Sequence, residues 1–326
     1  MDYSIRFAQT GGPEVLQWAP VGADDTPLKP KEARVRHHAV GVNYIDIYHR
    51  TGLYPLPLPS GIGLEGAGIV EAIGSDVTEV KVGERVAYAG GGAGSYAQVR
   101  NIAANVLVKL PDTIDFNTGA AMMLQGLTAQ YLLRRTYRVK AGETVLIHAA
   151  AGGVGLIVCQ WAKALGCTVI GTVSTEAKAA LARAHGCDFT INYSSENFVE
   201  RVKEITGGKG VPVVYDSIGK DTFIGSLDCL QPLGMMVSFG NASGPVPPFD
   251  LSELAKRGSL FITRPTLFSY VAKREDLVAM ADELFEMVSS GKLKIEVSHT
   301  YPLQEAAQAH IDLAARKTTG SIILMP

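Results

Sequence analysis

The pattern of apolar and polar positions changes about one third of the way along the chain. Up to about residue 111, short apolar runs are separated by Gly, Pro and Asp, a pattern that predicts β-strands. The predicted strands lie at residues 33–43, 66–74, 84–90 and 95–100. Helical spacing is scarce here, and the stretch after the first of these strands, to about residue 55, is expected to be a loop.

From residue 117 the pattern becomes helical and then alternates regularly between two kinds of run. Predicted helices lie at residues 117–139, 153–166, 175–186, 196–208 and from about residue 221. Predicted strands lie at residues 143–150, 167–173, 188–193, 211–219 and 234–240. Because the strand runs are apolar throughout and the helices are amphipathic, we expect a parallel sheet covered on both faces.

The last part of the chain resembles the first part more than the middle. A strand-like run at residues 259–265 is followed by one long helical pattern at 274–291 and a final strand-like run at 321–326. A length of 326 residues is typical of about two domains. We therefore predict an α/β domain (residues 125–265) inserted into a β-rich domain (residues 1–124 plus 266–326).

Composition excludes several classes of partner. Lys and Arg total 30 against 32 Asp and Glu, so the net charge of -2 favours neither nucleic acid nor an anionic membrane. No apolar run is long enough to span a bilayer, and no signal peptide is visible at the start. The four cysteines show no C-x-x-C spacing, which favours reduced, buried thiols in a cytoplasmic protein over disulfides or structural zinc.

The stretch HAAAGGVGLIVCQ, residues 148–160, is nearly a G-x-G-x-x-G phosphate loop between a predicted strand and a predicted helix. Gly152 is expected to let the backbone approach a pyrophosphate, and Gly155 to let the helix pack closely on the strand. The helix N-terminus at Gly153 and Val154 would present free N–H groups to the anion. Ala150 replaces the first glycine, which is tolerable if the turn there needs no positive φ.

The end of the next strand determines which nucleotide fits. Ser174 takes the position where sites for NAD usually carry an acid, and Lys178 follows in the first turn of a helix that Thr175 is expected to cap. A 2′-phosphate between Ser174 and Lys178 would explain a lysine at a helix start, which favours NADPH. We interpret Glu176 as a solvent-facing acid of the helix, with a contact to the ribose as the alternative. Tyr193 is expected either to stack near the adenosine or to pack against other side chains of the protein.

The 22-residue stretch GETVLIHAAAGGVGLIVCQWAK (142–163) resembles the signature of the quinone oxidoreductase (zeta-crystallin) family of medium-chain dehydrogenases/reductases. The similarity extends over the chain, through GVNYIDIYHRTGLYP (41–55), GLEGAGIVEAIG (63–74), YDSIG, VSFGNASG and ITRP. It implies a doubly wound Rossmann domain inserted in a GroES-like catalytic domain. It also implies a homodimer that pairs edge strands of the Rossmann domains near GSLFITRP.

Zinc-dependent alcohol dehydrogenases of the same superfamily carry zinc ligands where this chain has Asn43 and Leu64. Leucine cannot ligate a metal and asparagine is a poor zinc ligand, so we predict no metal. Hydride transfer then needs only a nicotinamide C4 about 3–3.5 Å from an electrophile in a dry interdomain cleft, and a quinone is a suitable acceptor.

The resemblance assigns Asn43, Tyr48 and Tyr54 to the place where nicotinamide and quinone meet. Asp46 is the only acid in that predicted loop, where it could relay a proton or cap a turn. His148 and His310 have no recognisable partner, so structural roles are expected for both. Further candidates for cofactor contacts are Gln125, Thr128, Tyr131, Ser217, Phe239, Gly240, Asn241, Arg264 and Arg316.

The leading hypothesis is a cytoplasmic NADPH-dependent quinone reductase. The alternatives are an NADPH-dependent reductase of α,β-unsaturated ketones or aldehydes, and a non-catalytic NADPH-binding protein such as a crystallin or an RNA-binding protein. The intact Asn43/Tyr48/Tyr54 set argues against pure binding, and the absence of a basic stripe argues against nucleic acid.

Overall fold

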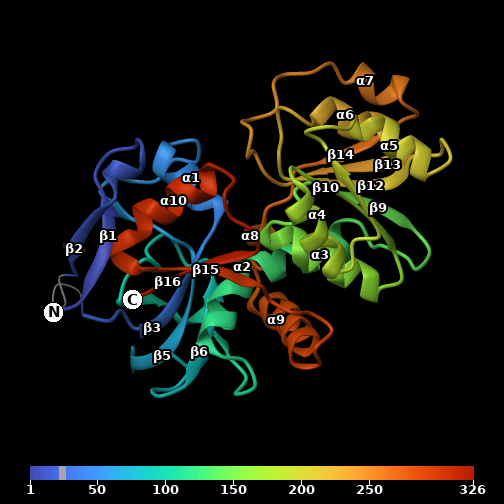
Figure 1. The fold of residues 1–326 in the computed structure, drawn as a ribbon. Helices are drawn as coiled ribbons and strands as arrows, with labels where there is room; N and C mark the ends of the chain where they lie inside the picture. Colours follow the sequence, from blue (N-terminus) through green and yellow to red (C-terminus); the bar gives the residue numbers. More distant parts are fainter. Residues whose placement is uncertain (22–26) are drawn as a thin grey trace. The chain divides into compact units, whose positions relative to one another are not determined.

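The computed structural model describes residues 1–21 and 27–326 and divides into two compact units. Unit 1 comprises Met1–Leu127, Val271–Gly291 and Ile295–Pro326, and unit 2 comprises Thr128–Tyr270 and Lys292–Lys294. Unit 1 is thus built from both ends of the chain and unit 2 from the middle, as the colours of Figure 1 show. Gln125, which the sequence analysis placed in the middle domain, lies in unit 1 in this division.

Unit 2 is a doubly wound α/β domain. Its strands are β9 (Thr144–Ile147), β10 (Thr168–Val173), β11 (Phe189–Asn192), β12 (Val211–Asp216), β13 (Leu230–Ser238) and β14 (Phe261–Thr263). They form a parallel sheet in the order β11-β10-β9-β12-β13-β14, the Rossmann order in which the chain reverses direction beside its first strand. The predicted parallel sheet is confirmed.

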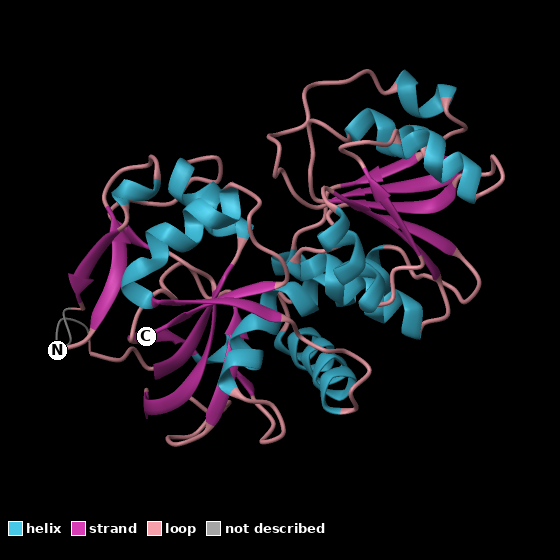
Figure 2. Ribbon diagram, in the orientation of Figure 1, coloured by secondary structure: helices cyan, strands magenta, loops and turns pink. Residues whose placement is uncertain are grey.

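Helices cover both faces of this sheet (Figures 1 and 2). The helices of unit 2 are α3 (Gly153–Ala164), α4 (Glu176–Ala184), α5 (Phe198–Ile205), α6 (Phe223–Asp228), α7 (Ser252–Lys256) and α8 (Leu267–Tyr270). The α3 and α4 helices lie on one face, and α5 and α6 on the other. This two-sided cover explains the continuous Val and Ile runs, because strands such as β9 and β12 are almost fully buried.

Unit 1 contains the β-rich part. Its strands are β1 (Tyr3–Phe7), β2 (Gln17–Pro20), β3 (Glu32–Val42), β4 (Ser60–Gly61), β5 (Glu65–Ile73), β6 (Arg85–Ala89), β7 (Val99–Ala103), β8 (Val108–Lys109), β15 (Val297–Pro302) and β16 (Ser321–Met325). The main sheet runs β15-β16-β3-β5-β6-β8, with β7 also paired to β3. Residues from the C-terminal strand β16 pair with Gly41 and Val42 of β3, so both ends of the chain share one sheet.

The helices of unit 1 are α1 (Tyr44–Thr51), α9 (Arg274–Ser289) and α10 (Ala306–Ala314), with short 3-10 turns at Pro13–Val15, Ala104–Val106 and Leu303–Glu305. The chain passes from unit 1 into unit 2 within α2 (Phe116–Tyr131), which continues as a π-helical turn, Leu132–Thr136. Apolar clusters of described residues in unit 1 lie around Phe7 and Tyr96 and around Val35 and Tyr88.

The α1 helix corrects the sequence analysis, which expected a loop after β3. The backbone N–H of Asn43 donates to Asp46 Oδ2 at 2.8 Å, so the N-x-x-D spacing caps the helix. Gly52 ends the helix in the left-handed conformation at φ 83°. The capping role considered for Asp46 is therefore confirmed, and the short, half-polar helix escaped detection by apolar periodicity.

Candidate active site

The glycine-rich loop of unit 2 lies between β9 and α3. The residue that takes a positive φ is Ala149, at 54°, and not Ala150. Gly152 is extended and directly precedes α3. A Cβ on Gly155 would lie 2.3 Å from the Ala149 carbonyl oxygen. Gly155 therefore allows α3 to pack closely on the glycine-rich loop, whereas the sequence predicted close packing on the strand. The helix N-terminus at Gly153 and Val154 carries no side-chain cap from Gly152, and its N–H groups can bind an anion.

Ala150 fits because the neighbouring strand makes room for it. It is fully buried, and its N–H donates to the Thr172 carbonyl at 3.0 Å. A Cβ on Gly171 of β10 would lie 2.5 Å from the Ala150 methyl carbon. The missing first glycine of the motif is thus matched by a glycine on the next strand.

The start of α4 has the predicted geometry. Thr175 Oγ1 accepts from the Lys178 N–H at 3.3 Å, which confirms Thr175 as the N-cap. Lys178 is half-buried in the first turn, and Ser174 is half-buried just before it. Glu176 pairs with Arg183 along the same helix, as a solvent-facing helix acid would. Tyr193 is 40% exposed beyond the end of β11, and its N–H donates to Val173.

A second group of predicted residues gathers at the carboxyl ends of β12, β13 and β14. Gly240 comes so close to Ser217 that a Cβ would lie 2.4 Å from the Ser217 carbonyl oxygen. Arg264 donates to the Gly240 carbonyl at 3.0 Å and to Ser238 Oγ at 3.3 Å. Phe239 and Asn241 flank Gly240 at this edge, where open α/β sheets bind ligands.

Thr128 and Tyr131 lie on the last turn of α2. They are hydrogen-bonded through their side chains, and burial raises the pKa of Tyr131 well above its ordinary value, so the phenol stays neutral. Tyr131 stacks on Tyr270 with ring centroids 4.5 Å apart. The Tyr270 hydroxyl also contacts Thr136 Oγ1 at 2.7 Å, in the π-helical turn. Tyr270 was not predicted, because nothing in its local sequence marks it.

In unit 1 the predicted aromatic residues lie on and just after α1. The predicted Tyr48 and Tyr54 form a cluster with Tyr44, which was not predicted. The ring centroids of Tyr44 and Tyr48 are 5.4 Å apart, and those of Tyr48 and Tyr54 are 5.1 Å apart. Tyr48 is buried and Tyr54 is half-buried. Arg316 follows α10 in a left-handed conformation at φ 58°, and its charge acts on the Tyr44 hydroxyl.

Asn43 is the centre of a buried hydrogen-bond chain that includes Gln125. Asn43 Nδ2 donates to Glu65 Oε2 at 2.7 Å, and Gln125 Nε2 donates to Asn43 Oδ1 at 3.1 Å. Glu65 Oε1 accepts from the Leu124 N–H at 2.8 Å, and Ser321 Oγ lies 2.7 Å from Gln125 Oε1. Glu65 and Ser321 were not predicted, although an acid inside the apolar strand GLEGAGIVEAIG was an available signal.

Asp46 begins a second buried chain. Tyr96 OH donates to Asp46 Oδ2 at 2.9 Å and lies 3.1 Å from His310 Nε2, while Arg50 Nη1 lies 3.4 Å from His310 Nδ1. Burial raises the pKa of Asp46 to about 7 and lowers the pKa of His310 to about 3. All four side chains are buried, so His310 serves to link α10 to α1.

His148 is also held inside the protein. Its ring nitrogens lie 2.9 Å from Thr172 Oγ1 and from Ser226 Oγ. Ser226 in turn donates to Asp216 Oδ2 at 2.8 Å. Burial lowers the pKa of His148, and with both nitrogens engaged in the core its role is structural, as predicted.

Neither unit shows a metal-binding group in its described residues: no cluster of three or more His, Cys, Asp or Glu side chains is placed to hold an ion there. Leu64, which precedes Glu65 in the chain, is buried. The four cysteines are buried free thiols, as predicted. Within residues 1–21 and 27–326, no helix has both the length and the apolar character needed to cross a membrane.

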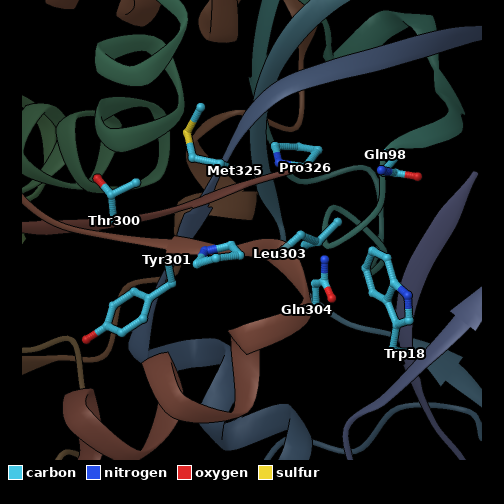
Figure 3. Close-up of a pocket in the computed structure, with 9 residues that line it drawn as sticks. Trp18, Gln98, Thr300, Tyr301, Leu303, Gln304, Met325 and Pro326 are labelled. Carbon is cyan, nitrogen blue, oxygen red and sulfur yellow. The ribbon is translucent and has the colours of Figure 1, made fainter.

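A separate pocket of about 420 Å³ lies elsewhere in unit 1 (Figure 3). Trp18 and Leu303 contribute apolar side chains to its lining, and Gln98 and Gln304 contribute amide groups. It shares no residue with the predicted site.

The buried Glu65 should make the stability of the fold depend on pH. Burial raises the pKa of Glu65 from 4.5 to about 8, although hydrogen bonds from Asn43 and Leu124 oppose this shift. Between these two values the folded chain holds a proton that the unfolded chain releases, so Glu65 lowers the free energy of unfolding as pH rises. Glu65→Gln should therefore gain stability relative to the parent protein from pH 5 to pH 8, by up to about 1.4 kcal/mol per pH unit.

Chemical denaturation at pH 5, 6.5 and 8 measures this difference. The exposed Glu275 on α9 provides the control, because Glu275→Gln should show a constant difference. A pH-independent difference for Glu65→Gln would show that Glu65 does not titrate abnormally.

Comparison with known proteins is consistent with this geometry. Residues 29–112 match the model of the alcohol dehydrogenase GroES-like domain, and residues 153–286 match that of the zinc-binding dehydrogenases. A quinone oxidoreductase of Pseudomonas aeruginosa is 58% identical over 99% of both chains. A 2-haloacrylate reductase of a Burkholderia species is 50% identical over 97% of this chain and 96% of its own. The crystal structure of Escherichia coli quinone oxidoreductase complexed with NADPH superimposes with a TM-score of 0.96 at 51% identity, covering 99% and 100% of the two chains.

Proposed function

The chain belongs to the quinone oxidoreductase family of medium-chain dehydrogenases/reductases, and on this basis we propose that it reduces quinones with NADPH. The observation that carries the proposal is the pair of residue groups already described. One group, in unit 2, is suited to a dinucleotide, and the other, around Asn43 in unit 1, is suited to a flat, neutral acceptor. The family consists of oxidoreductases by name, which favours an enzyme over a purely binding protein.

The residues of unit 2 fit NADPH. The N-terminus of α3 offers backbone N–H groups at Gly153 and Val154 for the pyrophosphate. Gly152 leaves space beside it, since a Cβ there would meet only the Ala149 carbonyl oxygen, at 3.2 Å. Ser217, Phe239, Gly240, Asn241 and Arg264 would hold the nicotinamide half at the carboxyl edge of the sheet, together with Thr128 and Tyr131 of α2.

The preference for NADPH over NADH follows from the start of α4. The Ser174 hydroxyl and the Lys178 ammonium group flank a helix N-terminus whose partial positive charge also favours an anion. Tyr193 follows the neighbouring strand β11 and would lie against the adenosine or its phosphate. In unit 1, Arg316 ends α10 in the left-handed conformation of a helix C-cap, with its N–H donating to Leu313 and that of Lys317 to Asp312, and its guanidinium would contact a cofactor phosphate or the substrate.

Asn43, Gln125, Tyr48 and Tyr54 would form the substrate end of the site. Asn43 and Gln125 are hydrogen-bonded to each other and would orient the nicotinamide or its ribose. Tyr48 and Tyr54 present neighbouring phenols that can cover a flat ring or donate to its oxygen. When bound, NADPH supplies the hydride. The protein residues orient the acceptor, exclude water and stabilise the oxyanion by hydrogen bonds, and no metal is required of them.

Steady-state oxidation of NADPH with 1,4-benzoquinone tests this function. We expect turnover with benzoquinone, and a loss of about 10-fold in kcat/KM for Tyr54→Ala with partial recovery in Tyr54→Phe, because the ring is retained there. Absence of turnover with any quinone would contradict the proposal. Equal losses in the Phe and Ala variants would show that the hydroxyl, and not the ring, carries the role.

A second candidate function is supported by one relative. The 50% identical Burkholderia enzyme is named as a 2-haloacrylate reductase, so a close relative acts on a carbon–carbon double bond conjugated to a carboxyl group. An α,β-unsaturated ketone or aldehyde is therefore the alternative acceptor for this chain. Turnover of an enone of the size of benzoquinone, with higher kcat/KM than benzoquinone, would establish it.

We also propose that two copies pair through β14. This strand is one of the two edge strands of the parallel sheet, and Phe261 on it is 56% exposed. An exposed apolar edge strand is a site for strand pairing. Sedimentation equilibrium should give about twice 34.7 kDa, and a monomer at micromolar concentration would contradict the pairing. The buried free thiols agree with the cytoplasmic location that we propose for the protein.

A further inference from the structure

Glu65 is a fully buried carboxyl group with no cation beside it. Its oxygens contact the Leu124 N–H and Asn43 Nδ2, at 2.8 and 2.7 Å. No salt bridge among the described residues involves it, and the charge of Asp46 further raises its proton affinity. A buried ionised carboxylate is costly without a positive partner, so Glu65 needs a function that an apolar residue could not perform.

In the hydrogen-bond chain that starts at Glu65, the donor and acceptor of every bond can exchange roles, which gives two opposite directions. With Glu65 ionised, Asn43 Nδ2 donates to Glu65, Gln125 Nε2 donates to Asn43 Oδ1, and Ser321 Oγ donates to Gln125 Oε1. With Glu65 protonated, its hydroxyl donates to Asn43 and both carboxamides turn over. Gln125 Nε2 then donates to Ser321 Oγ, whose own hydrogen is accepted by the Ala121 carbonyl oxygen 3.1 Å away.

Each bond between Glu65 and Ser321 keeps one donor and one acceptor in either direction, and each carboxamide group retains a second hydrogen and a second lone pair outside these bonds. The Ala121 carbonyl makes this possible, because Ser321 has a second acceptor within reach when Gln125 no longer needs its hydrogen. In contrast, the Leu124 N–H holds Glu65 Oε1 in the same place throughout. A single proton on the other oxygen, Oε2, therefore decides the direction of all three bonds.

Resting on the role of Asn43 in the proposed function, we propose that Glu65 is a positioning residue. By accepting from Asn43 or donating to it, Glu65 sets which face of the Asn43 carboxamide, donor or acceptor, remains to bind the cofactor. The side chains that share the electrostatic field of Glu65 are Asp46 of α1, Tyr88 of β6 and Tyr96. Burial raises the pKa of both tyrosines, so these phenols stay neutral while Glu65 titrates.

Glu65→Gln separates this role from simple packing. The side-chain carbonyl of the new glutamine would accept from Leu124 and its amide would donate to Asn43. This fixes the hydrogen-bond chain, at every pH, in the direction that it takes when Glu65 is protonated. Fluorescence titration should give an NADPH dissociation constant that changes about 3- to 10-fold between pH 6 and 9.5 in the parent protein. In Glu65→Gln the NADPH dissociation constant should stay, at every pH, at the value that the parent protein shows at low pH. Glu71→Gln, on the same strand, should titrate like the parent protein.

The side-chain amide resonances of Asn43 and Gln125 give a second readout that needs no cofactor. They should shift together with pH in the parent protein and stay fixed in Glu65→Gln, with Asn43→Ala and Gln125→Ala identifying the signals. Asp46 is present in every variant, so a step retained in Glu65→Gln belongs to Asp46 and overturns the proposal. If Asn43→Ala binds NADPH like the parent protein, the proposed function of Asn43 fails. If Asn43→Ala binds weakly while Glu65→Gln follows the parent at every pH, only the role of Glu65 fails.

Discussion

Replacing Gly155 with alanine is expected to weaken NADPH binding by about 100-fold and to destabilise unit 2 by about 1–3 kcal/mol. The added methyl carbon would lie 2.3 Å from the Ala149 carbonyl oxygen and 2.8 Å from Ala150 backbone atoms. These are backbone contacts that no side-chain rotation relieves, so either α3 or the loop must move. Such a movement displaces the N–H groups that we assign to the pyrophosphate.

Gly152→Ala is the matched comparison. Its methyl carbon would meet only the Ala149 carbonyl oxygen, at 3.2 Å, so the fold should lose little stability. Affinity for NADPH should still fall, because the methyl group takes space that the cofactor needs. Thermal denaturation and fluorescence titration separate the two effects. Full stability and full affinity in Gly155→Ala would contradict the packing argument.

Lys178→Ala is expected to raise the KM for NADPH by about 10- to 100-fold and to leave the KM for NADH nearly unchanged. A hydrogen bond to a charged group contributes about 1.5–3 kcal/mol, and NADH lacks the 2′-phosphate that this ammonium group would hold. Both constants are measured with the same quinone at fixed ionic strength.

Glu176→Gln is the neighbouring control for Lys178. Its carboxylate pairs with Arg183, so its removal should affect the two cofactors little. A selective loss of NADH binding in Glu176→Gln would instead favour the ribose contact that the sequence left open. Equal effects of Lys178→Ala on both cofactors would contradict the phosphate assignment.

Features of this fold that have local sequence signals could be predicted, and features built from distant residues could not. The β9–loop–α3–β10 segment was predicted to within a few residues, because apolar runs, glycine spacing and the Thr175 cap are all local signals. The α1 helix was missed because its capping signal, Asn43 with Asp46, is polar and its apolar stripe is short.

The hydrogen-bond chain around Asn43 could not be predicted from sequence. Its members come from β5, α2, β16 and the start of α1, and Ser321 is 196 positions from Gln125. Only the three-dimensional pairing of β16 with β3 brings the end of the chain to this place. The resemblance named Asn43, and Gln125 was a further candidate for cofactor contacts, but the residues that fix their orientation follow from the fold alone.

The contact between Ala150 and Gly171 has an evolutionary consequence. A Cβ at 171 would lie 2.5 Å from the Ala150 methyl carbon and 2.7 Å from Cys187 Sγ, so residues 150 and 171 cannot both carry a side chain, and a side chain at 171 also requires Cys187 to give way. Among relatives, we expect the two positions to covary, with glycine at 150 wherever 171 carries a side chain. An apparent defect in the phosphate loop is then one member of a compensated pair, and substitutions at either position should be interpreted, or designed, two at a time.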